Sequence, residues 1–261
     1  VSIHSEDEEI LNLRKKFIKK GDVHSHPEWR NSETAMSSTR RVVKIAERYN
    51  KKIHVLHVTT KEEVDFLAMH KKNVTFETTP QHLTLYAPDC YDKLGTYAQM
   101  NPPLRSKDHY DRLWVAIKNN IVDVLGSDHA PHLKKNKDKV YPNTPSGMPG
   151  VQTIFPVMID HVNNGKLELS QLINLMCENP CKIFGIKNKG FIKEGFDADL
   201  TIVDMDKEVT IKNEMIASKC GWTPFHNYKV KGFPIGTIVN GILVMSEGKI
   251  LVESKGQPLK F

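Results

Sequence analysis

The stretch Ile53-His54-Val55-Leu56-His57-Val58-Thr59-Thr60 decides the fold class. Its β-branched, apolar run predicts a buried strand, and Thr60 is a suitable N-cap for a helix from Lys61 to about His70. The same order of strand, polar residue and helix recurs about four times along the chain. Strands are expected over residues 1–4, 52–58, 73–79 and 121–125, with helices over 33–49, 61–70, 107–119 and, further on, 168–185. This alternation is typical of a parallel α/β fold.

Three of the expected strands end in possible metal ligands, namely His4, His57 and Asp128. The carboxyl ends of parallel strands meet at one end of a barrel, where catalytic residues gather. Imidazole and carboxylate groups are suitable zinc ligands, and a catalytic site needs them on separate strands around an open position. Singly, each residue has a structural explanation, such as Asp128 capping a turn. Together the three predict a metal site.

Two loops carry further candidate residues. Asn101 precedes Pro102 and Pro103, which hold it in an extended conformation suited either to a substrate contact or to a rigid connection. Asp128 opens the stretch Asp-His-Ala-Pro-His. Its last residue, His132, is either a surface residue or points into the same end of the barrel as the three possible metal ligands.

Two other patterns suggest metal sites less well. His24-Ser25-His26 would present both imidazoles on one face of a strand, but it follows Gly21-Asp22 and precedes Pro27, so a loop is expected. Cys177 and Cys181 are four residues apart on an expected helix without a third soft ligand nearby, which favours core packing. The four cysteines are expected to be reduced thiols of a cytosolic protein.

The pattern changes from about Gly190, where short β runs are separated by Gly, Asp and Lys. They predict a small antiparallel β domain without an active-site signature. The expected domains are residues 1–189, which form the α/β part, and residues 190–261, which form the β domain.

Composition excludes several classes of protein. Hydrophobic residues make up 39% of the 261 residues and charged residues 26%, a globular balance without a membrane-spanning run or a signal segment, so we expect a cytoplasmic protein. The net charge of +6 suits either an anionic substrate or a Lys-rich solvated surface. No nucleic-acid motif accompanies the lysines, so nucleic-acid binding is not expected.

The motifs resemble the amidohydrolase superfamily, and within it the bacterial- and archaeal-type dihydroorotases. The resemblance runs over essentially the whole chain. The family's motifs on its fifth to eighth strands, and the loop between the last two, are similar to His4-Ser5-Glu6-Asp7, 53–60, 77–83, Asn101-Pro102-Pro103-Leu104-Arg105 and 127–132. The family's composite β-sandwich domain is similar to residues 195–200 and 223–225.

This resemblance implies a TIM-type (β/α)8 barrel and a zinc enzyme that interconverts N-carbamoyl-L-aspartate and L-dihydroorotate in pyrimidine synthesis. Of its two zinc ions, one would be bound by His4 and His57, and the other by Asp128, which would also act as general acid and base. The remaining carried-over residues would bind the substrate: Asn101, His132, Ser146 and Gly147.

The chain departs from the family pattern at its start. The family's first-strand HxH motif, its substrate arginine and its fourth-strand carboxylated Lys or Asp have no counterpart here. The chain is therefore expected to be the C-terminal half of a barrel, with the N-terminal half of the same enzyme as its partner. The resemblance also implies a homo-oligomer, with aspartate transcarbamoylase as a candidate partner.

Other functions remain open from the sequence. Allantoinases and dihydropyrimidinases (hydantoinases) share the barrel, the metals and the ring-amide chemistry. Asn101 and His132 favour dihydroorotase, because its substrate carries a carboxylate to be held. The missing motifs favour a non-catalytic scaffold, whereas the retained His4, His57 and Asp128 argue against one.

Overall fold

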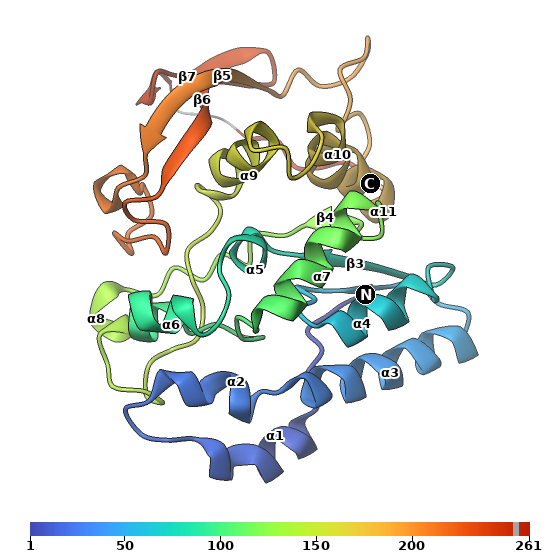
Figure 1. Cartoon of the computed structure of the whole chain (residues 1–261). Helices are drawn as coiled ribbons and strands as arrows, with labels where there is room; N and C mark the ends of the chain where they lie inside the picture. The colour runs from blue at the N-terminus through green and yellow to red at the C-terminus, as the bar shows by residue number, and fades with distance from the viewer. Residues whose placement is uncertain (253–255) are drawn as a thin grey trace. The chain divides into compact units, whose positions relative to one another are not determined.

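The computed structural model describes residues 1–252 and 256–261 (Figure 1). These residues form two compact units, one of Val1–Gln152 with Lys212–His226 and the other of Thr153–Ile211 with Asn227–Phe261. The domain division near residue 190 stays a prediction. Within the described ranges, no helix has the length and apolar character needed to cross a lipid bilayer.

The first unit contains a four-stranded parallel sheet in the order β1-β2-β3-β4. In the register of β1 and β2, Ile3 pairs with Val55, and Val55 in turn pairs with Phe76 of β3. The strands are β1 (Ser2–Ile3), β2 (Ile53–Val55), β3 (Val74–Thr78) and β4 (Val124–Leu125). The predicted parallel α/β arrangement is therefore confirmed, with strands shorter than the apolar runs suggested.

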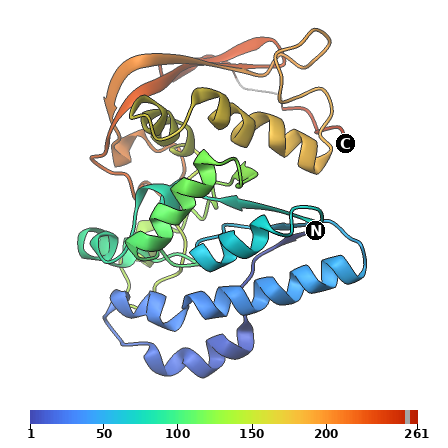
Figure 2. The ribbon, with the colours of Figure 1, turned by 45° about the vertical axis from the view of Figure 1, so that its right-hand side comes forward.

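Helices follow the strands as the sequence predicts. The Asp7 side chain accepts hydrogen bonds from Glu9 N and Ile10 N at the start of α1, and Thr60 Oγ1 caps α4 through Glu63 N. Figures 1 and 2 show α3, α4 and α7 lying side by side along the sheet. The helices of this unit are α1 (Glu8–Arg14), α2 (His26–Trp29), α3 (Ser32–Arg48), α4 (Lys61–Ala68), α5 (Pro80–Thr84), α6 (Asp89–Leu94), α7 (Lys107–Lys118) and α8 (Lys134–Lys137).

Two apolar regions hold the first unit together. Strand residues such as Val55 and Phe76 and helix residues such as Val43 and Val64 are fully buried. A second cluster lies among the loops that follow the strands, and it includes Val23, Cys90, Tyr91, Ala98, Met100, Leu104, Tyr141, Met148, Cys220 and Trp222. Burial of this second cluster stabilises the loops, because each large apolar side chain that is fully buried contributes about 1.5–3 kcal/mol.

The second unit carries a four-stranded antiparallel sheet in the order β5-β6-β7-β8, as predicted for the C-terminal β region. The sequence suggested separate runs at 199–204 and 209–211, but these are one strand whose register shifts twice against β6. Pro234 of β6 sits at one of the shifts, where a residue without an N–H group is tolerated. The strands are β5 (Leu200–Thr210), β6 (Lys229–Val239), β7 (Ile242–Ser246) and β8 (Lys249–Ile250).

Helix α9 (Ile154–Asn163) packs on β6 at a glycine. A Cβ on Gly232 would lie 2.1 Å from Ile159 Cγ2, so only glycine permits this approach. Asn163 Nδ2 donates to Lys231 O at 2.7 Å and holds the helix to the strand. The helical region 168–185 comprises α10 (Leu169–Ile173), a π-helical turn (Asn174–Glu178) and α11 (Asn179–Phe184).

The four cysteines are free thiols. Cys90 and Cys220 are buried, but Cys177 is exposed and Cys181 only half-buried. The prediction of core packing for Cys177 was therefore wrong. Cys177 lies in the π-helical turn, whose wider period departs from the regular helix on which that prediction rested.

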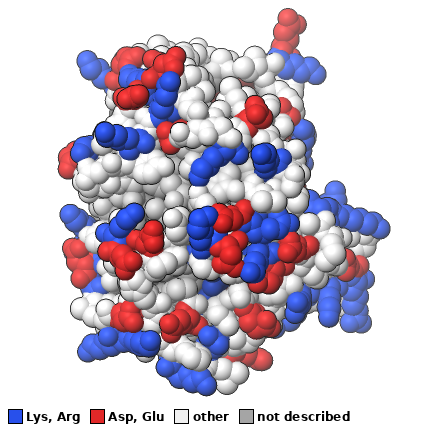
Figure 3. Space-filling model, in the orientation of Figure 1, with Lys and Arg blue, Asp and Glu red and all other residues white. Residues whose placement is uncertain are grey.

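Charged side chains of both signs are interspersed on the face shown in Figure 3. Many are paired, for example Lys107 with Asp111 on α7 at 2.6 Å. Such exposed pairs contribute little to stability, about 0–1 kcal/mol each.

Candidate active site

His4 and His57 meet at the carboxyl ends of neighbouring strands. His4 follows β1 directly and His57 lies two residues after β2, and β1 and β2 are paired in parallel. His4 Nδ1 lies 3.0 Å from His57 Nε2, and the two rings are edge to face with centroids 4.8 Å apart. Two residues that are 53 positions apart in the chain therefore direct ring nitrogens at one point.

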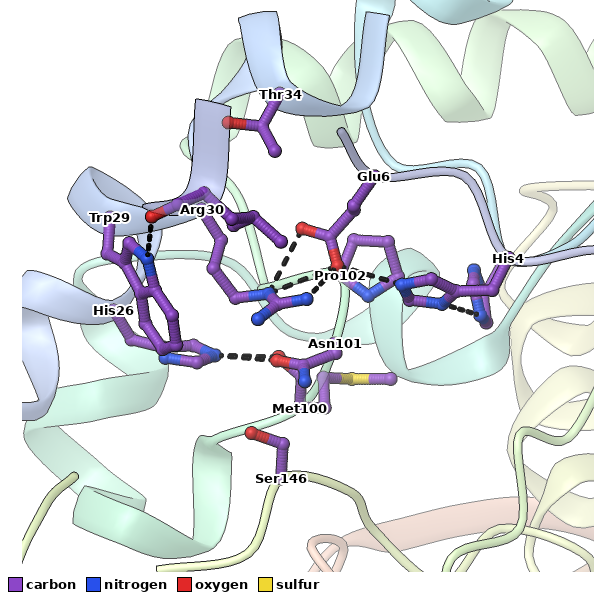
Figure 4. A network of polar contacts seen from close by, with 12 residues as sticks. His4, Glu6, His26, Trp29, Arg30, Thr34, Met100, Asn101, Pro102 and Ser146 are labelled. Carbon is purple, nitrogen blue, oxygen red and sulfur yellow. Dashed lines mark hydrogen bonds and ion pairs between the residues drawn. The ribbon is translucent and has the colours of Figure 1, made fainter. Parts of the chain in front are cut away.

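Glu6 fixes the orientation of the His4 ring (Figure 4). Its Oε2 lies 3.0 Å from His4 Nε2, and Arg30 Nε donates to both carboxylate oxygens at 3.1 Å. Burial alone would raise the pKa of Glu6, but the hydrogen bonds and charges of His4 and Arg30 outweigh it and lower the pKa to about 2. The ionised carboxylate only accepts hydrogen bonds, so His4 Nε2 donates to it and Nδ1 presents a lone pair toward His57.

Asp128 lies close enough to both histidines to interact with them electrostatically. It comes three residues after β4 and is half-buried. Burial raises the pKa of Asp128, and the charges of His57 and His4 oppose that shift. Burial and the neighbouring His4 lower the pKa of His57. The structure therefore brings the three predicted ligands to one end of the sheet.

The backbone of this site is strained at two positions. His57 has a φ of 35° and Asp128 a φ of 40°. Both values lie in the left-handed region, which residues other than glycine rarely adopt. Each such conformation costs on the order of 1–3 kcal/mol and persists where the surrounding structure imposes it. Two of the three candidate ligands therefore have a strained backbone conformation.

Asn101 is held by a histidine that sequence reasoning set aside. The buried His26 lies with Nε2 3.0 Å from both Asn101 Oδ1 and Met100 O, so Nε2 carries the proton and donates to both. Burial lowers the pKa of His26 to about 4, which keeps the ring neutral. His24 is exposed and pairs with Asp92 at 3.2 Å. The two histidines of this motif lie in a helical segment, not on a strand, and they have separate partners.

The remaining predicted residues form a second polar group. His132 Nε2 donates to Ser146 O at 3.0 Å, and Gln99 Nε2 donates to Ser146 Oγ at 3.0 Å. Gly147 has a φ of +127°, and a Cβ there would lie 2.4 Å from Ala130 Cβ. Figure 4 shows the Ser146 hydroxyl on the side of Asn101. The loop 144–147 therefore packs directly against the segment that carries Asn101.

Sequence reasoning missed the residues that hold the candidates in place. Arg30 orients Glu6, and the buried Arg105 donates from Nε to Thr59 Oγ1 at 3.2 Å and from Nη1 to Arg30 O. The sequence did contain a signal for Glu6. It lies two residues after His4, and side chains two positions apart on an extended segment point to the same face. Arg30 and His26 lie outside any local pattern that links them to the site.

The buried Glu6–Arg30 pair is expected to contribute strongly to stability. Replacing Arg30 by Met leaves the Glu6 carboxylate, which is 1% exposed, without its main partner, and should lower the free energy of unfolding by about 3–5 kcal/mol. Urea unfolding measures the change. Lys107→Met, which breaks an exposed pair, is the control and should cost less than about 1 kcal/mol. Equal losses in the two variants would contradict the assigned role of the buried pair.

Comparison with known proteins identifies the family. The model of the amidohydrolase family matches residues 1–244. The chain belongs to the amidohydrolase family. Within it, the chain is 38% identical to a dihydroorotase of Pyrococcus furiosus over 98% of this chain and 57% of that enzyme, and 35% identical to a dihydroorotase of Halobacterium salinarum over 94% and 56%. The chain thus spans little more than half the length of these relatives and corresponds to their C-terminal part.

Solved amidohydrolase structures have the same fold. An L-hydantoinase (dihydropyrimidinase) from Arthrobacter aurescens superposes with a TM-score of 0.91 at 30% identity over 97% of this chain and 58% of that one. A dihydropyrimidinase from Brevibacillus agri gives 0.88 at 27% identity over 96% and 57%. The parallel sheet and helices of the first unit are therefore part of the TIM-type amidohydrolase barrel, as predicted.

Proposed function

We propose that this chain carries the C-terminal half of the active site of a zinc-dependent dihydroorotase, which interconverts N-carbamoyl-L-aspartate and L-dihydroorotate. The observation that carries the proposal is the meeting of His4 Nδ1 and His57 Nε2 at 3.0 Å at the carboxyl ends of the strands, the same end of the sheet as Asp128. The relatives named dihydroorotase, at up to 38% identity in the matches above, support this substrate.

The donor set of His4 and His57 fits a metal ion. Two nitrogens bound to one zinc ion at about 2.0–2.1 Å would be roughly 3–3.4 Å apart, close to the separation seen here. Glu6, which accepts the His4 Nε2 proton, matches the carboxylate–histidine arrangement that orients metal-binding imidazoles. Among the residues that the structure describes, no group of three or more His, Cys, Asp or Glu is arranged to hold an ion. The other ligands would come from the N-terminal half of the barrel.

Each residue of the site has a role in ring-amide hydrolysis. Two bound zinc ions would polarise the amide carbonyl and make water acidic enough to attack at neutral pH. The Asp128 carboxylate would accept a proton from the attacking water and deliver it to the ring nitrogen as the carbon–nitrogen bond breaks. In the synthetic direction the same carboxylate would take the proton from the attacking nitrogen.

Asn101, His132 and the backbone at Ser146 and Gly147 would hold the substrate. The Asn101 amide oxygen already accepts from His26, which leaves its amide nitrogen available to donate to a carboxylate. The net charge of +6 suits an anionic substrate. These donor groups would favour dihydroorotate, which carries a carboxylate, over an uncharged ring.

Removal of the His132 imidazole should weaken substrate binding more than it slows the chemical step. His132→Ala in the complete polypeptide is expected to raise KM for dihydroorotate about 10-fold or more while kcat falls less than about 3-fold. Steady-state kinetics measure both constants. His70→Ala, at a histidine paired with Glu47 away from the site, is the control. A loss confined to kcat would assign His132 to the chemical step and remove it from substrate binding.

Hydantoinase is the second candidate, because the solved structures above that match at TM-scores of 0.88 and 0.91 are named hydantoinase or dihydropyrimidinase. Allantoinase shares the same chemistry. The complete polypeptide, loaded with zinc, should be assayed with dihydroorotate, hydantoin, dihydrouracil and allantoin side by side. Turnover of dihydroorotate at least about 100-fold faster than the others supports the proposal, because a site built for a polar group strongly rejects substrates that lack it. Preference for an uncharged ring would overturn it.

The wider setting follows from the same proposal. We infer a cytoplasmic enzyme of pyrimidine synthesis that forms a homo-oligomer, with aspartate transcarbamoylase as a candidate partner. A non-catalytic scaffold of dihydroorotase type is the alternative from another class. Absence of turnover with all four ring substrates, together with binding to aspartate transcarbamoylase, would favour the scaffold.

A further inference from the structure

A fully buried lysine lies beneath the loops that carry the proposed substrate residues. Lys137 ends the short helix α8 and is 0% exposed. Its ammonium group donates to three backbone carbonyls, those of Gln99 at 3.1 Å, Pro145 at 2.9 Å and Gly147 at 3.2 Å. The neighbouring Lys134 and Lys135 on the same helix are exposed.

No carboxylate pairs with Lys137 within 4.0 Å in the part of the chain that the structure describes. Burial lowers the pKa of Lys137 to about 7, and the ammonium lies 5.7 Å from the ring centroid of the buried Trp222. Burying a charge is costly unless hydrogen bonds and dipoles compensate for the lost water. Three converging carbonyls and an aromatic face supply that compensation.

The three carbonyls belong to two segments that are far apart in the sequence. Gln99 precedes Met100 and Asn101, whereas Pro145 and Gly147 flank Ser146. Gly147 N donates to Gln99 O at 2.9 Å, so this carbonyl accepts from Lys137 and from the loop at once. The ammonium therefore ties the segment of Asn101 to the loop of Ser146 and Gly147.

We propose that Lys137 is a positioning residue for the substrate. By binding the Gln99, Pro145 and Gly147 carbonyls, it fixes the spacing between Asn101 on one side and Ser146 and Gly147 on the other. This inference rests on the proposed function, because the residues it positions are the proposed substrate contacts.

Lys137→Met tests the proposal, since methionine keeps an unbranched side chain but removes the charge and the donors. In the complete polypeptide, KM for dihydroorotate should rise about 10-fold or more while kcat changes less than about 3-fold. Without the ammonium group the two segments move apart, and the substrate-binding groups that they carry no longer converge. Lys135→Met on the same helix is the matched control and should leave both constants unchanged. If Lys137→Met does not fold, Lys137→Gln, which keeps hydrogen-bond donors without the charge, should give a smaller rise in KM.

Hydrogen–deuterium exchange separates failure of this proposal from failure of the proposed function. In Lys137→Met, amide exchange should accelerate at residues 99–101 and 144–148 and stay unchanged in α3 and α4, whatever substrate the enzyme takes. If exchange is faster at these segments in Lys137→Met but the unmodified protein does not turn over dihydroorotate, the positioning role stands and the proposed function is rejected. Unchanged KM together with unchanged exchange at both segments, or faster exchange throughout the first unit, would overturn the positioning role.

Discussion

Asp128→Asn should reduce turnover of dihydroorotate by at least about 10³-fold while the protein keeps its fold, since general acid–base catalysis alone contributes about 10²–10⁴-fold. The amide has the shape of the carboxylate but neither its charge nor its ability to carry a proton. The effect should fall on kcat, because Asp128 acts on the reacting atoms and not on the remote part of the substrate. Steady-state kinetics and circular dichroism of the complete polypeptide measure the loss and the fold.

The control for this variant is Asp111→Asn, at an exposed aspartate paired with Lys107 on α7. It should leave kcat unchanged and show that loss of one negative charge is not itself the cause. Asp128→Asn with a rate near that of the unmodified enzyme would remove Asp128 from proton transfer.

His57→Ala should lower the zinc content of the complete polypeptide from two ions to about one per chain and abolish turnover. The imidazole supplies one of the two nitrogens that meet at 3.0 Å, and the remaining His4 would bind the ion too weakly to retain it. Elemental analysis after dialysis measures the metal content. A chelator should abolish turnover of the unmodified enzyme, and added zinc should restore it.

His24→Ala provides the matched control, because His24 is an exposed histidine in the His-Ser-His motif that we set aside as a metal site. Its zinc content should equal that of the unmodified enzyme. Loss of zinc in His24→Ala with full zinc in His57→Ala would contradict the assignment and transfer the metal site to the other motif.

The sequence predicted the parallel part of the fold well because its signals are local. The run from Ile53 to Thr60 contains a buried strand, a polar strand end and a helix cap within eight residues, and each appears in the structure. The convergence of His4 and His57 followed from the geometry of parallel strands, whose carboxyl ends share one edge of the sheet. The loop patterns already made Asn101 and His132 candidates. The family resemblance then gave these two residues a substrate-binding role and added Ser146 and Gly147.

The supporting residues could not be predicted, because their contacts join distant parts of the chain. Arg30 reaches Glu6 across 24 positions, and His26 reaches Asn101 across 75. Lys137 sits in a run of lysines that resembles a solvated surface, and only the tertiary structure distinguishes it from Lys134 and Lys135. Strand β5 was divided in prediction because its register shifts interrupt the alternation of apolar and polar residues.

The central claim is that His4 Nδ1 and His57 Nε2 bind one catalytic metal ion. Anomalous diffraction at the zinc edge, from crystals of the complete zinc-loaded polypeptide, tests it most directly. We predict a peak about 2.0–2.1 Å from both nitrogens, with Glu6 still hydrogen-bonded to His4 Nε2. A zinc peak at His24 and His26, or none near His4 and His57 in active protein, would contradict it.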